Sequence, residues 1–213
     1  MGHAGMAAAA VRYLRSVRAA PEREPVEVLP RPELRCVGED ERAPVGQAEF
    51  RRVLGNFATG VAVVTAPATA GAPQAPSPTD DPQAAAPAGF ACQSFSSLSL
   101  DPPLVAFMVG RTSTTWPRIA RAGVFCVNVL SAGQGELCRA FAVSGADKFA
   151  GVAYDAAPVS GSPRLAGTLA WIDCTIHAVH PGGDHLIVVG RVEALGAGDG
   201  DEAPLLFHKG RFL

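Results

Sequence analysis

The apolar residues of this chain fall into short runs that end at Gly, Pro or Ser, and only three segments show helical spacing. Runs of about four to eight residues rich in β-branched side chains are typical of strands. Parallel strands need helices between them, and no regular alternation of strand and helix is present. We therefore expect a mainly β fold, a Greek-key-like antiparallel β-barrel with helical decorations. The expected strands cover residues 61–65, 89–94, 104–109, 124–130, 169–180, 184–195 and 204–207, and the expected helices cover 47–57, 114–122 and 134–141.

Two stretches contain few large apolar side chains, and we do not expect them to join the core. Residues 1–46 are interpreted as an N-terminal extension, flexible or weakly helical, ahead of one domain over residues 47–213. The arginines of residues 1–21, a segment without acidic side chains, also suit a transit peptide. A variable tail is the favoured interpretation, because no long apolar core follows. Residues 66–88 contain six prolines and are expected to form a mobile, dispensable loop between two strands.

Composition excludes several classes of partner and site. The formal net charge of −2 and the pI near 6.2 argue against nucleic acid as a partner. No apolar run approaches the roughly 20 residues needed to cross a bilayer, so no membrane partner is expected. The five cysteines lack the spacing of a zinc half-site, and His177 and His180 should point to opposite faces of a strand. We expect no metal site, no disulfide framework and a cytoplasmic location.

The first candidate for a binding site is the polar segment that follows the strand expected at 89–94. It offers Gln93, Ser94, Ser96, Ser97 and Ser99 within a few residues. Hydroxyls and turn N–H groups can together hold a polar ring edge or a phosphate without using charge. A Ser-rich turn that caps its own backbone explains the same residues equally well. No GxGxxG turn is present, so a nucleotide-like ligand would have to be held without a Rossmann site.

The second candidate is the segment 111–115, which leads into the helix expected near Trp116. Arg111 and the hydroxyls of Thr112, Ser113 and Thr115 suit a bound phosphate at a helix start. The alternative is an ordinary Ser/Thr cap with an arginine that faces solvent, and the residues alone favour that alternative.

Six segments taken together resemble the short-chain flavin reductases, the reductase components of two-component flavin monooxygenases and halogenases. The match runs in order from about Phe50 to the C-terminus and is specific as a set. The segments are 56–65 (NFATGVAVVT), 93–104 (QSFSSLSLDPPL), 125–130 (FCVNVL), 145–149 (GADKF), 183–185 (GDH) and 207–212 (FHKGRF). The resemblance implies an FMN-binding split β-barrel and a homodimer with flavin near the subunit interface.

The resemblance also implies which residues bind the cofactors. Phe149 falls where the family has an aromatic residue beside the flavin, and His185 matches the histidine associated with nicotinamide binding and catalysis. Gln93 stands where relatives usually have Asn, and its amide can still reach the pyrimidine edge of a flavin. The implied flavin contacts are Thr59, Ala91, Cys92, Gln93, Ser94, Phe95, Ser96, Ser97, Ser99, Arg111, Ser113 and Thr115.

The expected activity is the transfer of a hydride from NADH or NADPH to FMN or FAD. The reduced flavin would then supply a partner monooxygenase or halogenase. Flavin carries the hydride chemistry itself, so no Ser/His/Asp triad is required of the protein. Two alternatives stay open at this point: a flavin- or haem-binding protein without turnover, and an oxidase of the wider superfamily that acts on a bound organic substrate.

Overall fold

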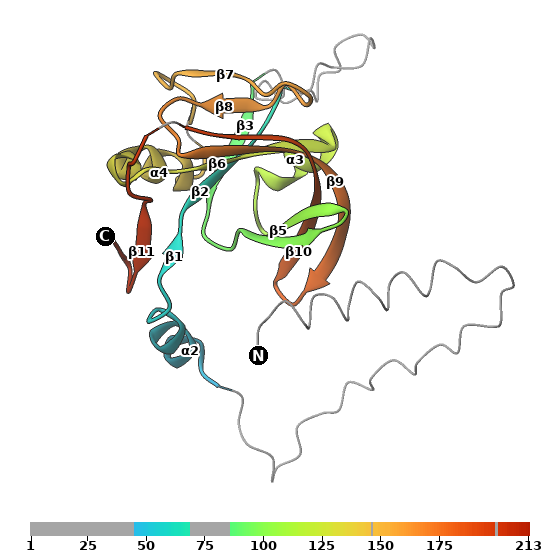
Figure 1. The fold of residues 1–213 in the computed structure, drawn as a ribbon. Coiled ribbons are helices and arrows are strands. Elements are labelled where there is room, and N and C mark those ends of the chain that lie inside the picture. The colour runs from blue at the N-terminus through green and yellow to red at the C-terminus, as the bar shows by residue number, and fades with distance from the viewer. Residues whose placement is uncertain (1–44, 69–85, 146, 199) are drawn as a thin grey trace, which may run out of the picture. The chain divides into compact units, whose positions relative to one another are not determined.

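The computed structural model describes residues 45–68, 86–145, 147–198 and 200–213 (Figure 1). The chain divides into two units, Met1–Phe50 and Arg51–Leu213, and the second contains all the strands given below. Most of the expected N-terminal extension and of the expected loop over 66–88 lies outside the described residues. Both therefore stay predictions, as does the domain boundary at residue 47.

A seven-stranded antiparallel sheet forms the body of the second unit, with the strand order β3-β2-β6-β9-β10-β5-β4. Its strands are β2 (Ala62–Ala66), β3 (Ala88–Cys92), β4 (Ser96–Leu100), β5 (Pro103–Gly110), β6 (Val124–Val129), β9 (Ala170–Gly182) and β10 (His185–Ala197). Two smaller sheets join β1 (Thr59–Gly60) with β11 (Leu206–His208) and β12 (Arg211–Phe212), and β7 (Tyr154–Ala156) with β8 (Pro163–Leu165). The prediction of a mainly β, antiparallel fold is confirmed.

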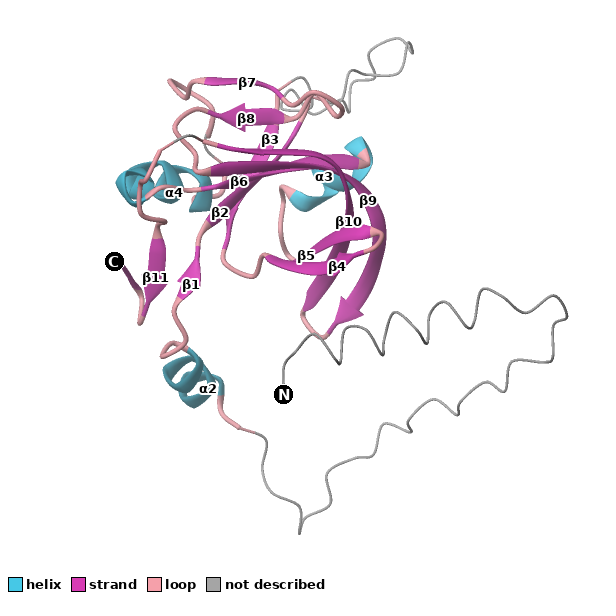
Figure 2. Cartoon of the chain, in the orientation of Figure 1, coloured by secondary structure: helices cyan, strands magenta, loops and turns pink. Residues whose placement is uncertain are grey.

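The described helices are short and lie close to the positions expected from the sequence (Figure 2). They are α2 (Gln47–Leu54), α3 (Trp116–Ala122), the 3₁₀ turn η2 (Ala132–Gln134) and α4 (Gly135–Ala142). Pro117 lies in the first turn of α3, where its missing N–H costs no helical hydrogen bond. The apolar face expected for residues 47–57 is not part of the core, because α2 ends at Leu54 and none of its residues is buried.

Strand β4 is a correction to the sequence analysis, which expected no strand over residues 96–100. These residues pair with β5, with one irregularity between Ser97 and Ser99. Serine has little intrinsic preference for strands, so the pattern gave no strand signal. Pairing with β5 supplies the backbone hydrogen bonds, and at the edge of the sheet the polar side chains of Ser96 and Ser97 remain exposed.

Two apolar clusters form the core, and strand β2 contributes to both. Alternate residues of a strand point to opposite faces, so Ala62 and Val64 join one cluster while Val63 joins the other. Phe107 lies at the centre of the first cluster, edge-on to Phe125 and Trp116 at centroid distances of 5.2 and 6.2 Å. Burying such a ring is worth about 1.5–3 kcal/mol. Helix α3 adds Trp116 and Ile119 to this cluster, and α4 adds Cys138 and Phe141 to the second.

The long hairpin β9–β10 carries the residues that matter most for the site. Its turn is Gly183–Asp184, and Gly183 has a φ of +70°, which favours glycine. Gly190 lies against the core, where a Cβ would come 2.3 Å from Cζ of Phe125. Only a residue without a side chain therefore fits at this point of β10. Pairing with β5 sets His185 opposite Gly110, at the end of the hairpin.

Candidate functional site

The first predicted segment leaves strand β3 beside the start of β2. Ala62 pairs with Cys92, so the residues just before Ala62 and just after Cys92 continue past the same end of the β2–β3 pair. Thr59 lies in β1 at this end, and its Oγ1 is buried without a hydrogen-bond partner in the described part of the chain. Buried hydroxyls normally find a partner. Thr59 thus offers a polar atom to a group that binds here.

Ser94, one of the predicted flavin contacts, forms two hydrogen bonds with the backbone of β5. Its hydroxyl donates to the carbonyl oxygen of Met108 at 3.0 Å and accepts the N–H of the same residue at 2.8 Å. In the pairing of β4 with β5, the backbone pair nearest to Ser94 is Ser96 with Ala106. The two bonds of the Ser94 hydroxyl continue the contact between the two segments beyond that pair. The Ser94 hydroxyl therefore bonds to a neighbouring strand rather than to the backbone of its own turn, and the residue links the 91–99 segment to β5.

Three other polar side chains of the 91–99 segment are free to bind a ligand. Gln93, Ser96 and Ser97 are exposed, and they form no side-chain hydrogen bond with the described residues. Ser99 and Phe95 are half-buried. Phe95 packs against the first core cluster, to which Cys92 of β3 belongs, whereas Ala91 packs against the second. An amide and two free hydroxyls at one end of the sheet can bind the polar edge of a ligand ring.

Cys92 belongs to this segment but has no reactive thiolate. Burial raises the pKa of its thiol above the ordinary value, although a contact with Ser94 Oγ at 3.4 Å acts in the opposite direction. A thiol that stays protonated is a poor nucleophile. We assign Cys92 a packing role at the end of β3.

The second predicted segment begins where β5 ends. Arg111 is exposed, and its backbone N–H donates to the carbonyl oxygen of Asp184 at 3.0 Å. The Ser113 hydroxyl accepts the backbone N–H of Trp116 at 3.2 Å, and the half-buried Thr115 makes no side-chain cap at the start of α3. Ser113 therefore acts as the helix-capping alternative proposes. Arg111 remains available to an anionic group.

His185 lies directly beside this second segment. It pairs with Gly110 across β5 and β10, and its Nδ1 is 2.8 Å from Oδ1 of Asp184. That hydrogen bond holds the pKa of the Asp184 carboxyl below its usual range, with the charge of His185 acting in the same direction. The carboxylate thus orients the imidazole, while half of the His185 side chain stays accessible to a ligand.

The structure brings three of the four predicted groups to one region around β5. Ser94 bonds to Met108, Met108 pairs with Ile187, and two residues further along Gly110 pairs with His185. Phe149 packs against the second core cluster, as Ala91 of β3 does, and its ring lies edge-on to Phe141 at 5.0 Å and to Tyr154 at 5.5 Å.

Lys148 donates to two backbone carbonyl groups next to Phe149, those of Gly89 and Phe141, both at 3.1 Å. Burial lowers the pKa of Lys148, and Arg118 lowers it further. These contacts give the segment around Phe149 a structural role in the second core cluster.

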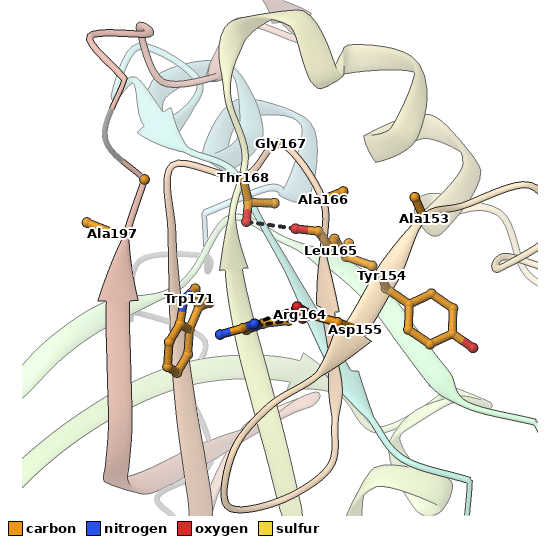
Figure 3. Close-up of a pocket in the computed structure, with 11 residues that line it drawn as sticks. Ala153, Tyr154, Asp155, Arg164, Leu165, Ala166, Gly167, Thr168, Trp171 and Ala197 are labelled. Carbon is orange, nitrogen blue, oxygen red and sulfur yellow. Dashed lines mark hydrogen bonds and ion pairs between the residues drawn. The ribbon is translucent and has the colours of Figure 1, made fainter.

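A pocket of about 450 Å³ lies elsewhere in the second unit and includes none of the predicted residues (Figure 3). Residues near the start of β9 and the end of β10 line this pocket, whereas His185 lies at the opposite end of the hairpin, next to its turn. Arg164 forms a bidentate ion pair with Asp155 and stacks on the ring of Trp171 at 4.7 Å. The charged groups of this pocket satisfy each other, and we do not assign it to the predicted site.

Two residues of the site region were not singled out from the sequence. Asp184 stands within the GDH segment, so its neighbour His185 is a signal that could have identified it. Gly110 carries no functional group and gave no signal at all. The described residues also contain no group of three side chains able to hold a metal ion, and no helix among them is long and apolar enough to cross a bilayer.

Comparisons with known proteins agree on one family. A family model described as "Flavin reductase like domain" matches residues 54–213. The reductase subunit HsaB of a flavin-dependent monooxygenase from Rhodococcus jostii is 46% identical over 163 residues, which are 76% of this chain and 75% of the relative. A flavin reductase from Pseudomonas putida is 44% identical over 80% of this chain and 91% of its own. An NADH-dependent FAD reductase from Streptomyces globisporus is 36% identical over 79% of this chain and 86% of its own.

Solved structures give the same result. Nitrilotriacetate monooxygenase component B from Mycobacterium thermoresistibile matches with a TM-score of 0.69 and 42% identity, over 78% of this chain and 85% of that one. The NADH:FAD oxidoreductase SgcE6 of Streptomyces globisporus, in complex with NAD and FAD fragments, has a TM-score of 0.69 and 35% identity, over 80% and 93%. BorF, the flavin reductase component of a bacterial two-component tryptophan halogenase, has a TM-score of 0.65 and 29% identity, over 79% and 97%.

Proposed function

The chain belongs to the flavin reductase-like family, and from that premise we propose that it transfers a hydride from NADH or NADPH to FMN or FAD and passes the reduced flavin to a partner oxygenase or halogenase. The observation that carries the proposal is the family match along residues 54–213. The register adds support, because it sets His185 beside the 111–115 segment, and Ser94 links the 91–99 segment to the same strand β5. The protein is thus an oxidoreductase in a two-component system.

The residues around β5 fit a flavin. Thr59 provides a buried hydroxyl without a partner among the described residues, and Gln93, Ser96 and Ser97 provide uncommitted polar groups. Arg111 provides a positive charge for a phosphate. This donor set is neutral apart from one arginine, which suits a ring edge and a phosphate rather than a metal ion.

Flavin supplies the hydride-accepting chemistry when it is bound, and the protein supplies orientation and hydrogen bonds. In the proposal, Gln93, Ser96 and Ser97 bind the polar edge of the ring and Arg111 binds phosphate. Thr59, Ala91, Cys92 and Phe95 shape the floor at the end of β3, with Ser94, Ser99, Ser113 and Thr115 completing the flavin contacts. Phe149 lies beside the flavin in this proposal, and His185 holds the nicotinamide. Each of these roles is a hypothesis for mutagenesis.

The proposal includes the finer architecture, a split β-barrel that forms a homodimer. Exposed apolar side chains on the edge strand β4 support a second copy as partner, because Leu100 is 94% exposed and Leu98 52%. Apolar groups gathered at one sheet edge mark an interaction surface more often than an inert one. The copy that covers them would also protect the free edge of β4.

The first expected result is that the purified protein oxidises NADH at a rate that saturates with added FMN or FAD. Saturation follows because flavin acts as an exchanging second substrate. The measurement is steady-state loss of NADH absorbance at several flavin concentrations. A rate that stays at zero at every flavin concentration, with NADH and with NADPH, would remove the proposed function and leave a binding protein.

The second expected result is that His185→Ala raises the KM for NADH roughly fivefold, because one neutral hydrogen bond is worth about 1 kcal/mol. Flavin affinity should barely change, since the proposed flavin contacts lie at residues 91–115. Flavin fluorescence titration and NADH kinetics on the same variant separate the two effects. His177→Ala, which alters another exposed histidine of the same hairpin, is the matched control and should behave as wild type. Loss of flavin binding with an unchanged KM would show that His185 serves the flavin instead.

A further inference from the structure

We propose that the bare backbone surface over Gly110, between Nε2 of His185 and Oγ1 of Thr112, receives the carboxamide of the reduced nicotinamide, and that Gly110 determines access to it. The inference rests on the proposed function and deepens it by naming two further residues of the hydride-donor site. The resemblance to the family gives Gly110 no role and includes Thr112 only within the 111–115 segment expected to contact flavin.

The geometry comes from what a side chain at position 110 would meet. A Cβ built on Gly110 lies 3.9 Å from Nε2 of His185 and 3.9 Å from Oγ1 of Thr112, and no other described atom comes within 4 Å. Two polar side chains from different elements therefore face the same empty point. The point lies at the end of β5, where Gly110 pairs with His185.

The fold itself does not require glycine at this position. Gly110 has no positive φ, and a Cβ would make only ordinary van der Waals contacts. By contrast, position 183 requires glycine because its φ is +70°, and position 190 requires glycine because the backbone lies so close to Phe125. A glycine inside a strand weakens the strand, and where packing does not explain the glycine, it often marks a close approach by a ligand.

The hydrogen-bonding capacity of the two side chains matches a carboxamide. The hydrogen bond to His185 lowers the pKa of the Asp184 carboxyl, so we take its oxygen as the acceptor and Nδ1 of the imidazole as the donor. In the neutral ring this leaves Nε2 as an acceptor that faces the space over Gly110. The Thr112 hydroxyl can donate. A carboxamide offers an N–H to Nε2 and a carbonyl oxygen to Oγ1, which satisfies both groups at once.

The test begins with Gly110→Ala, whose new Cβ would make only ordinary van der Waals contacts in the protein, and continues with the bulkier Gly110→Val. We expect the KM for NADH to rise about fivefold with alanine and more with valine, because the new side chain separates the carboxamide from its two partners. Flavin affinity and the melting temperature should stay close to wild type. Gly133→Ala is the matched control, since Gly133 has open space around it and lies in η2. A KM within twofold of wild type in both Gly110 variants would overturn the inference.

A cofactor analogue assigns the two hydrogen bonds separately. Reduced 3-acetylpyridine adenine dinucleotide keeps the carbonyl oxygen and lacks the amide N–H. Thr112→Val should raise the KM about fivefold for NADH and for the analogue, whereas the effect of His185→Ala should nearly vanish with the analogue. Equal effects of His185→Ala on both donors, or no effect of Thr112→Val, would overturn the assignment. These outcomes leave flavin-dependent NADH oxidation by the wild type intact, so they differ from failure of the proposed function, in which the wild type shows no such activity.

Discussion

Replacing Asn128 by leucine should lower the free energy of unfolding by about 3–5 kcal/mol, because it breaks a buried polar network that has no access to water. Asn128 is fully buried on β6. Its Nδ2 donates to the carbonyl oxygen of Val63, to Oγ1 of Thr65 and to the carbonyl oxygen of Pro163, at 3.2, 3.2 and 3.3 Å. Its Oδ1 accepts the backbone N–H of Leu165 at 2.8 Å. One side chain thus binds β8 to β2 and β6.

Leucine has a similar size but can replace none of these bonds. The Leu165 N–H would be left buried and unpaired, which alone costs about 1–3 kcal/mol. Asn128→Asp should retain the acceptor and lose the donors, and it adds a buried charge. Urea unfolding of the variants and the wild type measures the loss. Asn56→Leu is the matched control, because the exposed Asn56 also donates to backbone carbonyl groups, at 3.1 and 3.0 Å. If the two leucine variants lose equal stability, burial of the network is not the cause.

Gly190→Ala should destabilise the protein by about 2–3 kcal/mol, a large effect for the addition of one methyl group. The new Cβ would lie 2.3 Å from Cζ and 2.9 Å from Cε1 of Phe125. Phe125 cannot move away cheaply, because it is fully buried and packs edge-on against Phe107. The cost therefore comes from displacement of an aromatic ring inside a close-packed core.

A compensating variant tests that cause directly. Phe125→Leu removes the ring edge that meets the new methyl group, so Gly190→Ala should cost less in the Phe125→Leu background than in the wild type. The expected coupling is about 1–2 kcal/mol, measured as a double-mutant cycle by thermal or urea unfolding. Gly133→Ala, which adds the same methyl group in open space, should change stability by about 0.5 kcal/mol or less. Strict additivity of the two substitutions would show that Gly190 is constrained by something other than Phe125.

The sequence predicts the central strands well because packing decides them. The β-branched run at 61–65 and the run at 124–130 become β2 and β6, both of them largely buried. Strand β4 was missed because an edge strand depends on its neighbour β5 rather than on its own composition. Strands β1, β7, β8 and β12 contain two or three residues each, too few for an alternating pattern to show.

The candidate site likewise has parts that the sequence predicts and parts that it does not. Family-like motifs indicated the 91–99 segment, the 111–115 segment and His185, and the pairing of β5 with β10 brings the last two together. The role of Ser94 could not be predicted, since its hydroxyl bonds to Met108 on β5, which only the tertiary fold brings near. The bond of Ser113 to Trp116 is local and agrees with the helix-cap alternative that the sequence offers. Gly110 is important for the space that it leaves empty, and residue type alone cannot reveal such a space.

The pairing of β2 with β3 has a consequence for how this chain can vary. Ala66 pairs with Ala88, so residues 67–87 begin and end at adjacent points of the sheet. Arg118 holds the returning end by donating from Nη2 to the carbonyl oxygens of Ala86 and Pro87, at 2.6 and 3.2 Å. The entropy of closing a loop grows only with the logarithm of its length, about 0.6 kcal/mol for each doubling. Loop-closure entropy alone therefore predicts only a small change in the stability of the sheet when the connection between Ala66 and Ala88 changes length, and we expect a peptide inserted there by design to be tolerated.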